Sequence, residues 1–311
     1  MYYPYLRGRQ FELLALRDFA ENLKDGKSHV FPIIEPVRRN KNALKRAAIT
    51  MSENGMQYGI ILNPENGECA TEIIDLNIES DFPNSGKWAP TFIVNSNNTH
   101  QIEQIIEQNN YTGVILILLK TSSVSDDEII SLINNSHVSK IITDSPRRRI
   151  KSIVLSLGKE IISLTDNFEA KPKNAAYLEI EEELFSEEFA YYSQDAYSGF
   201  SDYTVIPNEF RDGGALPNVV AIHLTYQKQE DQIFVRHFCS KRNIDDHSNI
   251  QGKFGEAAGY AISFFDSNPT ENSIALDILR NYISVDSFPG LGMLKKISIL
   301  HHILLIQRIL N

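Results

Sequence analysis

Short apolar runs that alternate with amphipathic stretches constrain the fold of this chain more than any other feature. Seven runs precede residue 165 and an eighth follows, each rich in Ile, Val, Leu or aromatic residues. They lie at residues 2–6, 30–34, 58–62, 90–94, 114–119, 140–143, 160–164 and 200–206. Runs of this kind are typical of parallel strands buried on both faces. Helical periodicity between them, at residues 10–23, 99–109 and 125–133, predicts repeated βα units.

Eight parallel strands with intervening helices predict an α/β fold, a (β/α)8 barrel of the TIM-barrel type. An open, doubly wound sheet is the alternative, and such a sheet commonly carries a glycine-rich phosphate loop after its first strand. The residues after the first run, Arg7-Gly8-Arg9-Gln10, lack the G-x-G-x-x-G pattern. The barrel is therefore the preferred prediction.

The character of the chain changes after residue 206. Two β-rich runs, 219–226 and 232–238, flank a polar stretch at 227–231 and predict a β-hairpin with a five-residue loop. Helical patterns follow at residues 252–265, 272–282 and 294–310. We expect a barrel over residues 1–206 and a C-terminal elaboration over residues 207–311, packed on the barrel as a single compact unit.

The charge of the chain limits its partners. With 40 acidic and 30 basic side chains, the net charge of −10 repels nucleic acid on average, which excludes broad nucleic-acid binding by this chain alone. The distribution is uneven: residues 1–50 carry 10 − 5 = +5, and residues 51–100 carry 1 − 7 = −6. A local site for an anion near the start of the chain therefore stays open. The acidic run at residues 179–183 is most simply the start of a solvated helix.

Cysteine content and hydropathy point to the cytoplasm. Cys69 and Cys239 are too few and too far apart for a disulfide framework or a metal-binding cluster. The longest apolar stretch, residues 113–119, is too short to cross a bilayer. The N-terminus shows no cationic segment followed by an apolar run, so we expect neither secretion nor a membrane partner.

Polar side chains follow the predicted strands at the end where barrel enzymes place their active sites. Reading these ends in order gives Arg7, Glu35, Asn63, Asn95, Lys120, Asp144, Asp166 and Asp202. The candidate catalytic residues among them, serving acid–base chemistry or holding a divalent cation, are Glu35, Lys120, Asp144, Asp166 and Asp202. The candidate ligand-binding residues are Arg7, Arg9, Asn63 and Asn95, with His223 and His237. The structural alternative is that polar residues simply cap strand ends, and no cofactor is firmly implied.

Glu35 and the histidine pair each allow two interpretations. Glu35 interrupts an apolar strand end, and it serves either catalysis or a buried ion pair with Arg7 or Lys120. His223 and His237 lie on paired strands of the predicted hairpin, where a hydrogen-bonded core pair is favoured over a pair of ligands. No metal is assigned to any of these residues.

Several sequence motifs resemble the "beta protein" family of phages and bacteria. They begin with Tyr3-Pro4-Tyr5-Leu6-Arg7-Gly8-Arg9-Gln10-Phe11-Glu12 and Phe31-Pro32-Ile33-Ile34-Glu35-Pro36-Val37. They continue with Gly199-Phe200-Ser201-Asp202-Tyr203, Ala221-Ile222-His223-Leu224-Thr225-Tyr226 and Lys253-Phe254-Gly255-Glu256-Ala257, so the resemblance spans nearly the whole chain. It implies a barrel-like fold, a bacterial accessory role and a small nuclease-like protein as neighbour in defence-type gene neighbourhoods. It supplies no catalytic assignment.

Two functional hypotheses follow. The first is an accessory, partner-binding component of a bacterial antiphage defence or toxin-type system, with an anionic small ligand at the barrel mouth. The alternative is a cytoplasmic TIM-barrel hydrolase or lyase that acts on a phosphorylated or nucleotide-like small molecule. The sequence leaves open whether the chain is an enzyme, its oligomeric state, and whether the hairpin at residues 219–238 extends the barrel wall.

Overall fold

The computed structural model describes residues 1–23, 27–74, 87–145, 147–213 and 216–311. By its internal contacts the chain divides into two compact units. The first comprises residues 1–13, 20–165 and 191–202, and the second comprises residues 14–19, 166–190 and 203–311. The sequence predicts that residues 166–190 belong to the barrel segment, which ends at residue 206. The contacts assign these residues to the second unit instead.

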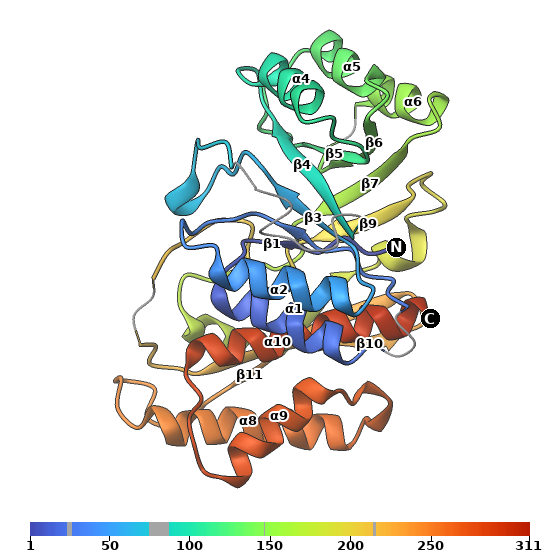
Figure 1. Cartoon of the computed structure of the whole chain (residues 1–311). Coiled ribbons are helices and arrows are strands. Elements are labelled where there is room, and N and C mark those ends of the chain that lie inside the picture. Colours follow the sequence, from blue (N-terminus) through green and yellow to red (C-terminus); the bar gives the residue numbers. More distant parts are fainter. Residues whose placement is uncertain (24–26, 75–86, 146, 214–215) are drawn as a thin grey trace. The chain divides into compact units, whose positions relative to one another are not determined.

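Eight parallel strands of the first unit form a barrel-shaped sheet, which confirms the predicted fold class (Figure 1). The strands, in their spatial order, are β1 (Tyr5–Leu6), β2 (Ile33–Ile34), β3 (Tyr58–Ile61), β4 (Trp88–Val94), β5 (Val114–Leu118), β6 (Val138–Thr143), β7 (Glu160–Thr165) and β9 (Gly199–Asp202). Tyr2 closes the sheet, because it bridges Val30 on one side and Phe200 on the other. The Tyr3 N–H also donates to the Phe200 carbonyl at 2.8 Å.

The first two strands are shorter than the apolar runs that predict them. Pro4 and Pro32 lie just before β1 and β2, and a proline has no N–H to donate to a neighbouring strand. Their carbonyls still accept, from the N–H groups of Ile33 and Gly59, both at 2.8 Å. The two proline residues therefore shorten the regular ladder without opening the barrel.

Helices follow β1, β2, β4, β5 and β6 of the first unit. They are α2 (Asn42–Glu53), α4 (Thr99–Gln108), α5 (Asp126–Asn134) and α6 (Arg148–Ser156), while α1 (Gln10–Glu21) contributes to both units. Figure 1 shows α4, α5 and α6 outside the sheet that contains β5 to β7. Each buries its apolar stripe, as α4 does with Ile102 and Ile106. A capping box starts α5, because Ser125 and Glu128 exchange hydrogen bonds between side chain and backbone.

The second unit contains a three-stranded antiparallel sheet of order β10-β11-β8. Its strands are β8 (Glu182–Ser186), β10 (Ala221–Gln229) and β11 (Gln232–Cys239), and its helices are α8 (Ile250–Asp266), α9 (Ile274–Ser284) and α10 (Leu291–Leu310). The short helix α7 (Glu188–Tyr191) has its first three residues in this unit and its last residue in the first unit. The predicted hairpin and C-terminal helices are thus present, and the hairpin pairs with β8 in a sheet separate from the barrel sheet.

Two local predictions in this unit are wrong. The hairpin loop is a turn of two residues, Glu230 and Asp231, because β10 continues to Gln229 through an irregularity in its pairing. The acidic run at residues 179–183 does not start a helix. Its last residues enter β8, since Arg236 on β11 bonds Glu181 and Glu182 and offsets their repulsion.

In the described part of the chain, none of the helices combines the length and apolar character needed to cross a membrane.

Candidate functional site

The carboxyl ends of the parallel strands bring the predicted polar residues of the first unit to one edge of the barrel, which we call the rim. Arg7, Glu35, Asn63, Asn95, Lys120 and Asp144 follow β1 to β6, and Asp202 ends β9. Asp166, which follows β7, is exposed and belongs to the second unit. These residues divide into groups with different surroundings.

Glu35 is completely buried, and its carboxylate is surrounded by hydrogen-bond donors. Oε1 accepts from the backbone N–H groups of Glu65 and Asn66 at 2.8 and 2.9 Å, and the Asn66 amide donates to both oxygens. Oε2 accepts from the Tyr5 hydroxyl at 2.9 Å and lies 3.5 Å from the Arg7 Nε. A carboxylate held in this way fastens three successive βα connections, which is the structural alternative foreseen for it.

The turn after β1 gives Arg7 and Arg9 different roles. Gly8 has a φ of +60°, and a Cβ at that position would lie 2.9 Å from the Glu35 carbonyl oxygen, so glycine fits this turn best. The Arg7 side chain is only 13% exposed, and its guanidinium lies 4.7 Å from the Tyr5 ring centroid. Arg9, on the other side of Gly8, lines a cavity.

This cavity, which we call the Arg9 cavity, has a volume of about 330 Å³ and lies where α1 and α2 begin. Its polar wall includes Arg9, Arg38 and Lys41, and its apolar wall includes Phe11, Leu13, Pro36, Val37 and Leu44. None of the described residues that line it is a carboxylate. Arg38 is paired with Glu68 at 2.8 Å. Lys41 is the N-cap residue of α2 and makes no side-chain capping bond there.

Glu12 supports the same turn from the first turn of α1. Its carboxylate accepts hydrogen bonds from the backbone N–H groups of Arg7 and Arg9, and it is 3% exposed. Burial raises the pKa of the Glu12 carboxyl, and the charges of Arg9 and Arg7 oppose that rise. Glu12 is not among the site residues predicted from the sequence, although its place in the first turn of a helix after two arginines is a usable signal.

The two asparagines of the rim hold loops. Asn63 donates to the Ile93 carbonyl at 2.7 Å and accepts from the Ile93 N–H at 2.9 Å, so its amide bonds one backbone residue in both directions. Asn95 donates to Glu65 at 3.2 Å and accepts from the Asn97 N–H at 3.1 Å. Both amides are therefore already engaged in the structure.

Lys120 and Asp144 lie together at the ends of β5 and β6. The Lys120 N–H donates to the Asp144 Oδ1 at 2.6 Å, and both residues are exposed. The surroundings shield the carboxyl of Asp144 from part of the water, which raises its pKa, and the hydrogen bond from Lys120 opposes this rise. Asp202, by contrast, is buried at the end of β9 and accepts from the Tyr2 hydroxyl at 2.6 Å, which ties the last strand to the first.

His223 and His237 form a hydrogen-bonded pair in the second unit, with their Nδ1 atoms 2.8 Å apart. The His237 Nε2 lies 3.1 Å from a Glu183 carboxylate oxygen, which can only accept. A neutral His237 thus donates from Nε2 and accepts at Nδ1 from the His223 N–H. Burial lowers the pKa of His223 to about 3 and lowers that of His237 as well. The ring of Tyr177 packs on both imidazoles.

Metal binding gains no support from these groups. Among the described residues, no cluster of three or more His, Cys, Asp or Glu side chains could hold a metal ion. Comparison of the chain with known proteins finds no matching family model. No curated protein matches it either.

Proposed function

We propose that this chain is an accessory, ligand-binding component of a bacterial defence or toxin-type system, and that the Arg9 cavity binds a small anionic ligand. The accessory role, the cytoplasm as its location and a nuclease-like protein partner rest on the sequence, chiefly on the resemblance to the "beta protein" family. The two cysteines, Cys69 and Cys239, are free thiols, in keeping with a reducing compartment.

The anion site rests on the composition of the cavity wall. Arg9, Arg38 and Lys41 line the cavity, and none of its described lining residues is a carboxylate. Its volume of about 330 Å³ lies within the range of about 300–1,000 Å³ that is usual for small-molecule sites. The apolar wall, with Phe11 and Leu44, suits the hydrocarbon part of such a ligand. A carboxylate or phosphate attached to a small apolar group is the class of ligand that fits.

The enzymatic alternative has less support from the geometry. Glu35 and Asp202 are buried and hydrogen bonded, so neither is placed to exchange protons with a ligand. Lys120 and Asp144 are the observation in its favour, because they are exposed, adjacent and of opposite charge. On this alternative Lys120 would hold a phosphate and Asp144 would act as an acid.

Calorimetric titration with benzoate, which joins a carboxylate to an apolar ring, tests the anion site. Lys41→Ala removes a cation from the wall, and Arg46→Ala removes an exposed cation from the same helix outside the cavity. We expect Lys41→Ala to weaken binding about 10-fold and Arg46→Ala to leave it unchanged, since tenfold corresponds to about 1.4 kcal/mol. Benzyl alcohol, which lacks the charge, should bind more weakly than benzoate. Equal losses in the two variants, or no binding by the wild type, would refute the site.

Co-expression with the neighbouring gene tests the accessory role. We expect the chain to co-purify with the neighbour's product and to show no hydrolase activity when purified alone. A monodisperse monomer that retains no partner under co-expression contradicts this part of the proposal, whatever the outcome of the benzoate titration.

A further inference from the structure

A second cavity opens on the rim at the ends of β5 and β6, and we infer that it binds the phosphate group of a small phosphorylated molecule. Its volume is about 100 Å³, enough for a tetrahedral oxyanion but too small for a whole nucleotide. Its polar lining consists of Lys120, Ser122, Thr143, Ser145 and Arg147. We call it the Lys120 cavity.

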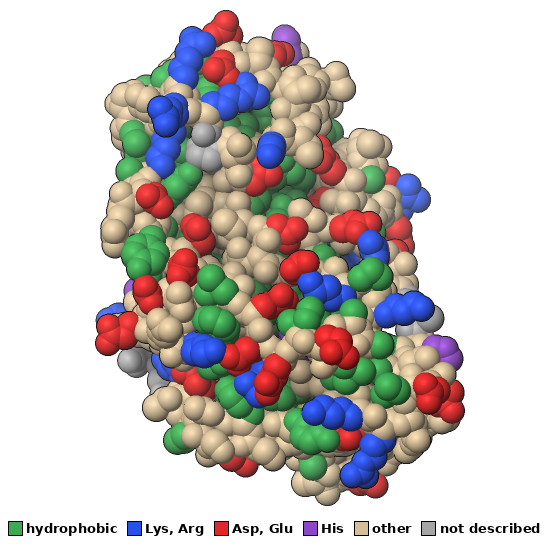
Figure 2. Space-filling view, turned by 180° about the vertical axis from the view of Figure 1, so that it is seen from behind, with side chains coloured by type: hydrophobic (Ala, Val, Ile, Leu, Met, Phe, Trp, Pro, Cys, Tyr) green, Lys and Arg blue, Asp and Glu red, His purple; other side chains and the backbone are tan. Residues whose placement is uncertain are grey.

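The polar part of the lining consists of groups that recognise phosphate, and apolar side chains such as Val124 and Ile129 complete the wall. Lys120 and Arg147 are cations, and the three other polar residues are hydroxyl donors. None of the described lining residues is a carboxylate. Asp144, which follows β6, directs an oxygen to the Lys120 N–H at 2.6 Å, so it bonds the backbone of the loop. Figure 2 shows Lys and Arg side chains gathered over the part of the molecule that carries α6.

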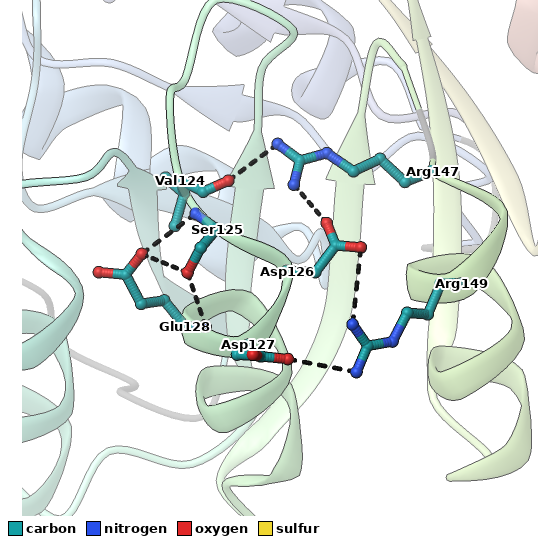
Figure 3. Close-up of polar contacts among 7 residues, drawn as sticks. All are labelled: Val124, Ser125, Asp126, Asp127, Glu128, Arg147 and Arg149. Atoms are coloured by element: carbon teal, nitrogen blue, oxygen red, sulfur yellow. Dashed lines mark hydrogen bonds and ion pairs between the residues drawn. The ribbon is translucent and has the colours of Figure 1, made fainter.

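Arg147 is held in place by the start of α5 (Figure 3). Its guanidinium donates to the Val124 carbonyl at 2.9 Å and is bonded to the Asp126 carboxylate. Asp126 and Asp127 also face Arg149, at 4.0 and 3.2 Å. The acidic start of α5 therefore orients two of the arginines that begin α6, which reduces the entropy that Arg147 would lose on binding a ligand.

Thr143 supplies the most specific sign of a ligand. It is 3% exposed and lines the cavity, and its Oγ1 accepts from the Ser145 N–H at 3.3 Å. Within the described part of the chain, no acceptor is bonded to its hydroxyl hydrogen. A buried donor of this kind costs free energy until an acceptor arrives, and a phosphate oxygen in the cavity is such an acceptor.

Electrostatics at the start of α6 favours the same ligand. Three consecutive arginines, residues 147–149, lie where the helix macrodipole is already positive. The N-cap residue Arg147 makes no side-chain capping bond, whereas the start of α5 is closed by its Ser125 capping box. A bound dianion would offset the arginine charges and the macrodipole together.

Titration with inorganic phosphate in a phosphate-free, low-salt buffer at pH 7.5 tests the site. Thr143→Val keeps the shape of the side chain and removes its hydroxyl, and Lys120→Met removes the ammonium group. We expect each variant to stay folded, with a cooperative thermal transition in the absence of phosphate, and to bind phosphate at least 10-fold more weakly than the wild type. Wild-type affinity in both variants, or no phosphate binding by the wild type, overturns the inference.

Two further measurements identify the ligand and separate this site from the Arg9 cavity. Tighter binding of glycerol phosphate than of inorganic phosphate supports a phosphorylated small molecule as the natural ligand, and equal or weaker binding overturns that assignment. Lys41→Ala, in the wall of the Arg9 cavity, should leave phosphate binding unchanged. If Lys41→Ala abolishes phosphate binding and Lys120→Met does not, phosphate binds in the Arg9 cavity, and the present inference fails while the proposed function stands.

Discussion

Lowering the pH from 7 to 5 should destabilise the second unit through its buried histidines. His301 on α10 is 1% exposed, and its Nε2 donates to the Thr225 carbonyl at 2.8 Å. Its Nδ1 is 2.8 Å from the Ser273 hydroxyl, which must donate because a neutral imidazole has only one N–H. The hydrogen bonds therefore hold His301 in its neutral form. Burial lowers the pKa of His301 to about 4, and that of His223 to about 3.

The sign of the effect follows from proton binding. In the unfolded chain both histidines have a pKa of about 6.5, so at pH 5 they bind protons that the folded chain excludes. Proton binding lowers the free energy of the unfolded state relative to the folded state as the pH falls through 6.5, and this lowering ends only near the folded-state pKa. With a folded pKa of about 4, linkage gives a loss of about 1.8 kcal/mol for His301 between pH 7 and pH 5. His223 contributes a similar loss, so the two histidines together lower the free energy of unfolding by about 4 kcal/mol between pH 7 and pH 5.

Urea denaturation followed at pH 7, 6 and 5 measures this loss. We expect the free energy of unfolding to fall by about 4 kcal/mol, a large share of the ~5–15 kcal/mol of a typical domain. His301→Gln should be less stable at pH 7 but should lose only about half as much on acidification. His100→Gln, which removes an exposed histidine from α4, should keep the wild-type pH dependence. A free energy that is constant or rises from pH 7 to pH 5 would refute the reasoning.

Three substitutions in the barrel unit test its construction by chemical denaturation. Gly8→Ala should lower the free energy of unfolding by about 1–3 kcal/mol, because the new Cβ adds a close contact with the Glu35 carbonyl to the strain of a left-handed backbone. The loss should exceed that of Gly113→Ala, where φ is +69° and nothing lies within 4 Å of the Cβ, and equal losses would contradict the role of the contact. Ser125→Ala, which removes the capping box of α5, should cost about 1 kcal/mol, and a stability equal to wild type would show that the box contributes nothing. Glu35→Ala should cost about 3–5 kcal/mol, because it leaves Arg7 and several donors without the carboxylate, and Glu35→Gln should cost less; the reverse order would argue against a structural ion pair.

The sheet could be predicted because its information is local in sequence. Most of the buried strands are nearly continuous apolar runs, and parallel pairing follows from the helices between the runs. Strands β3 to β7 therefore begin and end within two residues of their predicted positions. The predictions failed where a distant partner decided the structure. The last residues of the acidic run at 179–183 belong to β8, where Arg236, more than 50 residues later, bonds the run. No local pattern contains that contact.

The candidate site shows the same limit. Strand ends can be read from the sequence, and Glu35, Lys120 and Asp144 do follow them at the rim. What each side chain faces depends on loop geometry, which the pattern of apolar residues does not encode. Glu35 is enclosed because the loop after β3 turns its Asn66 amide and N–H toward the carboxylate. Arg147 reaches the Lys120 cavity because Asp126, on another helix, holds it there.

The arrangement of charge at the rim supports the proposed binding of anions more than the proposed hydrolytic alternative. The buried carboxylates Glu35 and Asp202 already accept hydrogen bonds from within the barrel unit, so they hold its strands and loops together. The cavities are lined instead by cations, with Arg9 and Lys41 in one and Lys120 and Arg147 in the other. A chain with a net charge of −10 repels anions at long range, so attraction has to come from these local groups. Water screens an ion pair in a partly buried cavity less than an ion pair on the surface. Anion affinity should therefore depend more on the cations that line the cavities than on the net charge of the chain.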